Sequence, residues 1–146
     1  TMRAPLSTLS AAPAQPEASM PQPGVIDREM LESMIVFLGP DGHALVADVV
    51  QIFLKSTPDI IQQMDTALQR ADLLTVQLAA HSLKSSSATL GATHLSQCAT
   101  RLEIATREAR TTPNSAAQPM ARFEVMLDQL RAEFNRPDAE LKDMGY

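Results

Sequence analysis

Two side chains in the stretch "LAAHSLKSSSATLGATHL", residues 78–95, have types and a spacing suited to group transfer. His81 supplies a nitrogen nucleophile that is largely neutral at neutral pH, and Lys84 supplies a cation one helical turn away. Ser85 and Ala88 are small, so a partner's backbone can come close to the ring. A nucleophile, a cation and a clear approach are what phosphoryl transfer to histidine requires, because that reaction depends on positioning and charge neutralisation.

The helix that carries His81 is predicted to begin after Asp72, which is a good N-cap, and to end at Gly91. A rotation of 100° per residue places a set of apolar residues opposite His81, where the core must be. This set comprises Val76, Ala79, Leu83 and Leu90. His81 is therefore predicted to face solvent.

The exposed face of this helix is also predicted to be a docking surface. Leu74 and Leu78 fall near His81, where a soluble monomer gains little from leucine, so these positions favour contact with a partner. The same face includes Gln77, Ser85 and Ala88.

The rest of the chain supplies further amphipathic helices to position this one. Apolar stripes at three- and four-residue steps predict helices after Asp27, after Asp41 with a kink at Pro58, from about residue 93, and around residues 123–134. Residues 111–119 are predicted to be a loop, and no alternating strand pattern of useful length occurs. Short connections between such helices favour an antiparallel bundle, so the fold class is all-α.

Three segments are predicted along the chain. Residues 1–26 contain half of the prolines and read as a Pro/Ala-rich linker or tail, residues 27–135 as the helical domain, and residues 136–146 as a polar C-terminal tail. Because the sequence begins with Thr1, we expect it to be part of a longer chain.

The composition limits the possible functions. A net charge of −5 and a pI of about 5.1 give no electrostatic case for a nucleic-acid or anionic membrane partner. No apolar run is expected to span a bilayer, and no signal peptide is evident. The single cysteine, Cys98, excludes an internal disulfide and fits a reducing compartment.

The motif around His81 resembles the signature of histidine-containing phosphotransfer (HPt) domains, A-H-x-L-K-G followed by a glycine. The matching positions are Ala80, His81, Leu83, Lys84, Gly91 and Ala92. The flanking segments "FLKSTPDIIQQMDTAL" and "CATRLE" are similar to the neighbouring helices of the family, and the resemblance covers about residues 27–135. One departure is Ser85, where the family usually has glycine.

This resemblance implies a four-helix bundle with an accessory N-terminal helix. It implies that His81 accepts a phosphoryl group from a receiver-domain aspartate and passes it to another receiver, with Lys84 stabilising the group. It also points to Glu103, 22 residues after His81, as a partner of the ring. The spacing agrees, because His81 lies 10 residues before Gly91 and Glu103 lies 12 after it, so an antiparallel return brings them level.

The resemblance also implies a biological setting. Such domains often end hybrid sensor kinases, so we expect the parent to be a bacterial inner-membrane sensor with this domain on the cytoplasmic side. The domain is expected to need no cofactor of its own, with Mg²⁺ on the receiver, and to be a monomer, a dimer being possible. No kinase nucleotide-binding motif appears in this sequence.

Two alternatives remain at this point. The first is an HPt-like bundle that docks a receiver or dimerises without carrying phosphate. The second is a metal site at His94 and Cys98, four residues apart on one helix, but this pair lacks evident third and fourth ligands. No metal site is therefore predicted.

Overall fold

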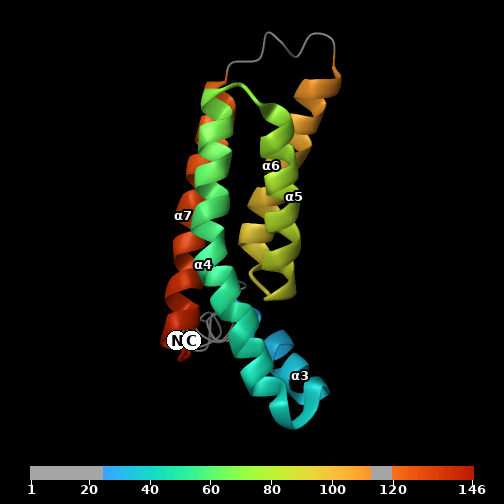
Figure 1. Cartoon of the computed structure of the whole chain (residues 1–146), viewed down its shortest axis with the longest axis vertical. Helices are drawn as coiled ribbons and strands as arrows, with labels where there is room; N and C mark the ends of the chain where they lie inside the picture. The colour runs from blue at the N-terminus through green and yellow to red at the C-terminus, as the bar shows by residue number, and fades with distance from the viewer. Residues whose placement is uncertain (1–24, 113–119) are drawn as a thin grey trace, which may run out of the picture.

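The computed structural model describes residues 25–112 and 120–146, and within these ranges the secondary structure is helical throughout. The elements are α3 (Arg28–Leu38), a 3-10 turn η1 (Gly39–Asp41), α4 (Gly42–Gln69), α5 (Leu73–Thr89), α6 (Thr93–Thr111) and α7 (Ala121–Asp143). Helices α4 to α7 run side by side along the long axis, while α3 lies at one end beside the start of α4 (Figure 1). The predicted all-α four-helix bundle with an accessory N-terminal helix is confirmed.

The ends of the helices follow local chemistry. The Asp27 carboxylate accepts the backbone N–H of Met30 at 3.1 Å, and the Asp72 carboxylate accepts that of Thr75 at 3.1 Å, so these two predicted N-caps are confirmed. Asp41, which was also predicted to cap a helix, precedes α4 but its side chain makes no capping hydrogen bond. Helix α4 continues through Pro58, as the unbroken apolar stripe predicts.

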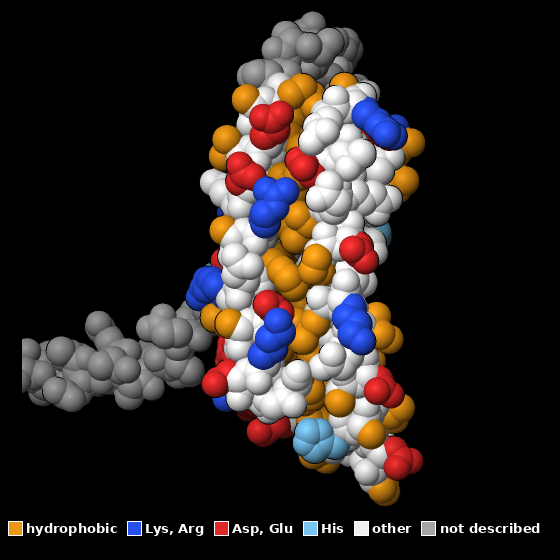
Figure 2. Space-filling model, turned by 60° about the vertical axis from the view of Figure 1, so that its left-hand side comes forward, with side chains coloured by type: hydrophobic (Ala, Val, Ile, Leu, Met, Phe, Trp, Pro, Cys, Tyr) orange, Lys and Arg blue, Asp and Glu red, His pale blue; other side chains and the backbone are white. Residues whose placement is uncertain are grey.

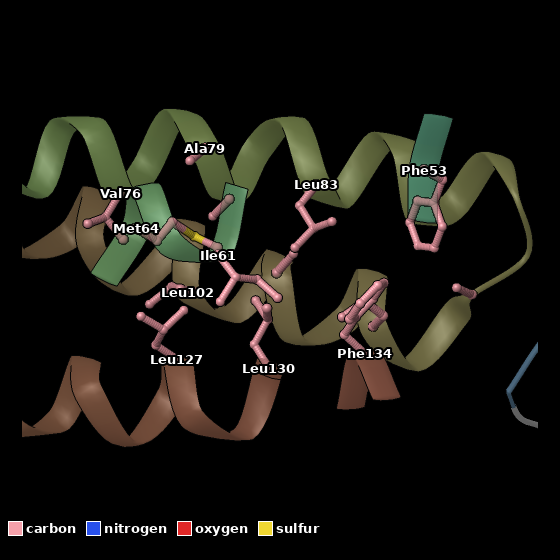
Figure 3. Packing of buried hydrophobic residues seen from close by; sticks show 14 of the residues in the cluster. Phe53, Ile61, Met64, Val76, Ala79, Leu83, Leu102, Leu127, Leu130 and Phe134 are labelled. Carbon is pink, nitrogen blue, oxygen red and sulfur yellow. The ribbon is translucent and has the colours of Figure 1, made fainter. Parts of the chain in front are cut away.

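The core is built from aliphatic side chains of all four long helices. Leu83 from α5, Leu102 from α6, Leu127 and Leu130 from α7 and Met64 from α4 are almost completely buried and point toward one another (Figure 3). Two phenylalanines, Phe53 and Phe134, meet edge to face, with 5.9 Å between their ring centroids. This interior fixes α5 with its Leu83 side inward and therefore its His81 side outward.

The α3–α4 pair needs close backbone contact. Gly42 lies directly against the backbone of Ile35, where a Cβ atom would clash. Only glycine therefore fits at this position.

The stretch Arg28–Gln69 is long and apolar enough, by length and composition only, to cross a membrane. This differs from the expectation that no segment of the chain could span a bilayer. This is weak evidence, because core helices of soluble proteins pass the same test. In the structure the stretch forms two helices, separated by η1 and packed against each other.

The predicted C-terminal tail, residues 136–146, is wrong as a boundary. Helix α7 passes through Pro137 and ends at Asp143, and Leu141 is fully buried. Proline removes one helical hydrogen bond, but burying a leucine side chain contributes about 1.5–3 kcal/mol. The extension also holds the α3–α4 pair, since Glu140 bonds to Arg28 at 2.8 Å and the Gln51 amide donates to the Tyr146 carbonyl at 3.1 Å.

The predicted N-terminal boundary also shifts slightly. Ile26, assigned to the linker, is buried in the core, and the Asp27 backbone N–H donates to the Gly91 carbonyl at 2.9 Å. The packed domain therefore includes residues 25 and 26. The remainder of the predicted linker, residues 1–24, and most of the predicted loop, 113–119, lie outside the described residues.

Candidate functional site

The site is built on the α5–α6 hairpin. Gly91 adopts φ +75°, in the left-handed region, and the Ala92 N–H returns to the Ser87 carbonyl at 2.8 Å. A side chain at Gly91 would meet the backbone of Asp27, only 2.9 Å from the position of its Cβ. The tight turn sends α6 back along α5, which sets which residues of the two helices lie level.

His81 and Glu103 meet across this hairpin. The Nδ1 atom of His81 lies 2.6 Å from Oε2 of Glu103, so the contact expected from the spacing is present. The imidazole side chain is 57% exposed, whereas the Glu103 side chain is only 8% exposed. The carboxylate thus holds the inner edge of the ring and leaves the outer edge in solvent.

Lys84 binds the same carboxylate. Its Nζ lies 2.8 Å from the second oxygen, Oε1, of Glu103. This ion pair was not predicted from the sequence, where Lys84 was expected to bind only an incoming anion. Lys84 lies one turn after His81 on the same side of the hairpin. The helix register that predicts the His81–Glu103 contact therefore also predicts that Lys84 lies near Glu103.

The electrostatics of Glu103 follow from these bonds. Burial raises the pKa of its carboxyl group, but hydrogen bonds from Lys84 and His81 and the charges of both residues outweigh burial, so the net pKa is lowered. Glu103 is therefore ionised at neutral pH and can only accept hydrogen bonds.

The ionised carboxylate determines the tautomer of His81. Because Glu103 cannot donate, the hydrogen on the 2.6 Å contact must be on Nδ1. Among residues 25–112 and 120–146, no side chain bonds the other ring nitrogen, Nε2. In the neutral ring Nε2 carries an available lone pair on the solvent side.

The predicted docking residues lie around this ring. Leu74 and Leu78 are 45% and 58% exposed, and Ser85 and Ala88 are also exposed. Gln77 is half-buried, and its side-chain oxygen accepts a bond from Arg110 of α6 at 2.7 Å. Arg110 was not predicted as part of this face, because nothing in the local pattern of α6 distinguishes it from other surface arginines.

The alternative metal site gains no support from the arrangement. No group of three or more His, Cys, Asp or Glu side chains that could hold a metal occurs in the part of the chain that the structure describes. Cys98 is half-buried against the core rather than in it. His94 is also half-buried.

Comparison with protein-family models matches residues 48–133 to the Hpt domain, which is more than half of the chain. The chain belongs to the Hpt domain family. A histidine phosphotransfer role in a phosphorelay follows from this membership. Helix α3 and the first residues of α4 lie before the matched residues.

A solved structure supports the same fold. The domain is similar to histidine-containing phosphotransfer protein B (HptB) from Pseudomonas aeruginosa PAO1, with a TM-score of 0.67 and 21% identity, covering 82% of this chain and 92% of that one. A likeness at this identity shows the fold alone. Comparison with curated proteins found no match.

Proposed function

We propose that His81 is the phosphoacceptor, taking a phosphoryl group from the aspartate of one receiver domain and passing it to the receiver of a response regulator. The observation that carries this proposal is the exposed imidazole whose Nδ1 is held 2.6 Å from the Glu103 carboxylate. That bond orients the ring and leaves Nε2 as the nucleophile.

The transfer step needs only the His81 ring and the phosphorylated aspartate of the receiver as reacting groups. The Nε2 lone pair attacks phosphorus, the bond between phosphorus and the aspartyl oxygen breaks, and the aspartate leaves as a carboxylate with the electron pair. Since Nδ1 keeps its proton, the phosphorylated ring gains a positive charge, which the Glu103 carboxylate offsets. The second transfer runs the same step in reverse onto the next receiver's aspartate.

Lys84 stabilises the phosphoryl group in this account. An ammonium group has three donors, and the bond to Glu103 occupies one of them. The remaining donors are available to phosphoryl oxygens, because the side chain is 32% exposed on the same face as His81. Glu103 therefore holds both the nucleophile and the cation.

Docking uses the surface around the ring, comprising Leu74, Gln77, Leu78, Ser85 and Ala88. The two leucines offer apolar contact, while the small residues toward Gly91 leave room for the receiver backbone. Serine at position 85 is small enough to preserve this approach.

The domain is proposed to belong to a longer sensor protein. The Pro/Ala-rich composition of residues 1–26 supports a tethered module at the C-terminal end of a hybrid sensor kinase, on the cytoplasmic side of the membrane. The Mg²⁺ used in transfer belongs to the receiver, and the domain acts as a monomer.

The test is phosphotransfer from a phosphorylated receiver to the wild type and to His81→Gln. We expect acid-labile, alkali-stable label on the wild type alone, with both proteins equally helical by circular dichroism. If several receivers leave the folded wild type unlabelled, the domain is a docking module without phosphate transfer. Label retained on His81→Gln would place the acceptor elsewhere.

A further inference from the structure

Charge is distributed unevenly between the α5–α6 hairpin and the rest of this acidic molecule. Helices α5 and α6 contain four Lys or Arg residues and two carboxylates, a net charge of +2, whereas the chain as a whole has −5. The remaining residues therefore carry −7. The hairpin that presents His81 is cationic on a molecule that is otherwise anionic.

Arg110 of α6 is a cation on the His81 side of the hairpin, and Gln77 of α5 holds it in place. Its guanidinium Nη1 lies 2.7 Å from Oε1 of Gln77, one turn before His81 on α5. A guanidinium has five N–H donors, so this bond leaves most of them available. Because Gln77 restricts the long side chain in advance, less rotamer entropy is lost when a partner binds.

The position of Arg110 suits a role at the edge of a docking interface. It follows Glu103 by seven residues, which corresponds to about 10 Å along the helix axis. A typical partner footprint of about 800 Å² has a radius of roughly 16 Å, so an interface centred on His81 includes Arg110. Exposed Leu74 and Leu78 lie on the same stretch of α5.

We propose that Arg110, held by Gln77, binds a carboxylate on the receiver surface and thereby contributes to the choice of receiver. This inference rests on the proposed function and names the chemistry of its partner, an acidic surface bordered by apolar side chains. The partner must already carry its reacting aspartate at the centre of the interface, and the net charge of α5 and α6 favours further carboxylates around it.

The chain offers a matched control in Arg101. This arginine is also exposed on α6, but it lies about 160° around the helix from Glu103, and its guanidinium contacts Sγ of Cys98 at 3.5 Å. Arg101→Glu and Arg110→Glu change the net charge of the protein equally. Only the second removes the cation from the His81 side.

The test measures transfer from a phosphorylated receiver at several receiver concentrations. For Arg110→Glu we expect KM to rise at least tenfold with kcat within twofold of wild type, and the hydrolysis lifetime of the phosphorylated protein to stay unchanged. Arg101→Glu should alter KM less than twofold. Arg110→Lys should give an intermediate KM, since it keeps the charge and loses the planar fork.

The possible results separate this inference from the proposed function. If the wild type is labelled and Arg110→Glu behaves like Arg101→Glu, Arg110 has no role in docking and the function stands. A fall in kcat at unchanged KM would also overturn the inference, because a docking residue should act on binding. If the wild type accepts no label, both proposals fail.

Discussion

Along α7, Arg131, Arg136 and Lys142 each pair with a carboxylate three or four residues earlier on the same helix. In the α5–α6 hairpin, by contrast, the polar contacts of His81, Lys84 and Gln77 all cross to the other helix. Ion pairs within one helix lie along its surface and do not fix its position relative to other helices. Contacts between helices hold reactive groups at set distances, which is what a site for group transfer needs.

The surroundings of the two regions differ in the same way. Figure 2 shows the side on which α7 and α4 lie, where acidic and basic side chains flank a seam of apolar ones. A shallow pocket on this side, with a volume of about 250 Å³, is lined by Pro58, Ile61, Gln62, Arg131, Phe134 and Asn135 and contains no histidine or carboxylate. The charged side chains near α7 therefore lie beside apolar residues packed between helices, whereas those near His81 lie beside a nucleophile.

The largest effect on transfer after loss of His81 itself is expected for Glu103→Ala. This change removes both the acceptor for Nδ1–H and the anion that offsets the charge of the phosphorylated ring, so we expect the transfer rate to fall about 10- to 100-fold. Single-turnover transfer from a phosphorylated receiver measures it. Glu103→Gln, which keeps one acceptor oxygen, should lose less, and equal losses in both variants would show that orientation is not the role of this residue.

Lys84→Ala should have the next largest effect. The phosphoryl group loses its cation, but the ring stays bonded to Glu103, so we expect transfer to slow about tenfold or the phosphohistidine to hydrolyse faster by a similar factor. Rates of transfer and of loss of label, measured on the same preparation, check both outcomes. An unchanged rate together with an unchanged lifetime would remove the assigned role of Lys84.

The lowered pKa of Glu103 predicts a pH-dependent contribution to stability. A carboxyl group whose folded pKa is below its ordinary value of 4.5 stabilises the fold fully above that value, and the contribution is lost as pH falls through the folded pKa. Urea unfolding of the wild type and Glu103→Gln should show a constant gap from about pH 7 to about pH 5.5, which narrows toward about pH 3. A gap that widened on acidification would reverse the sign and contradict the lowered pKa.

The smallest effect is expected on α7. Asp128→Ala breaks a 2.7 Å pair with Arg131, but both side chains are largely exposed, so the free energy of unfolding should change by less than about 0.5 kcal/mol. Transfer from the receiver should be unchanged. A loss comparable to that of Glu103→Gln at neutral pH would end the distinction between the two regions.

Much of this arrangement was accessible from the sequence because it depends on local signals. Asp27 and Asp72 have the residue type of N-caps, and the spacing of His81 and Glu103 about Gly91 predicts their contact. Each of these rests on one helix or one turn. The outward direction of His81 followed from the helical periodicity of a single segment.

The features that the sequence analysis missed depend on longer range. Pro137 has the sequence signature of a helix end, and only the tertiary structure shows that α7 continues past it and that Leu141 is buried there. The pairing of Gln77 with Arg110 requires the rotation of α6 about its axis, because its own sequence offers several exposed polar residues as possible partners for Gln77.

The most direct test of the account is to identify the atom that carries phosphate. Protein with ¹⁵N-labelled histidine, phosphorylated by a receiver, can be examined by NMR for coupling between phosphorus and each ring nitrogen of His81. We expect phosphate on Nε2 and a proton retained on Nδ1, bonded to Glu103. Phosphate on Nδ1, or on a residue other than His81, would contradict the claim that Glu103 selects the reactive nitrogen.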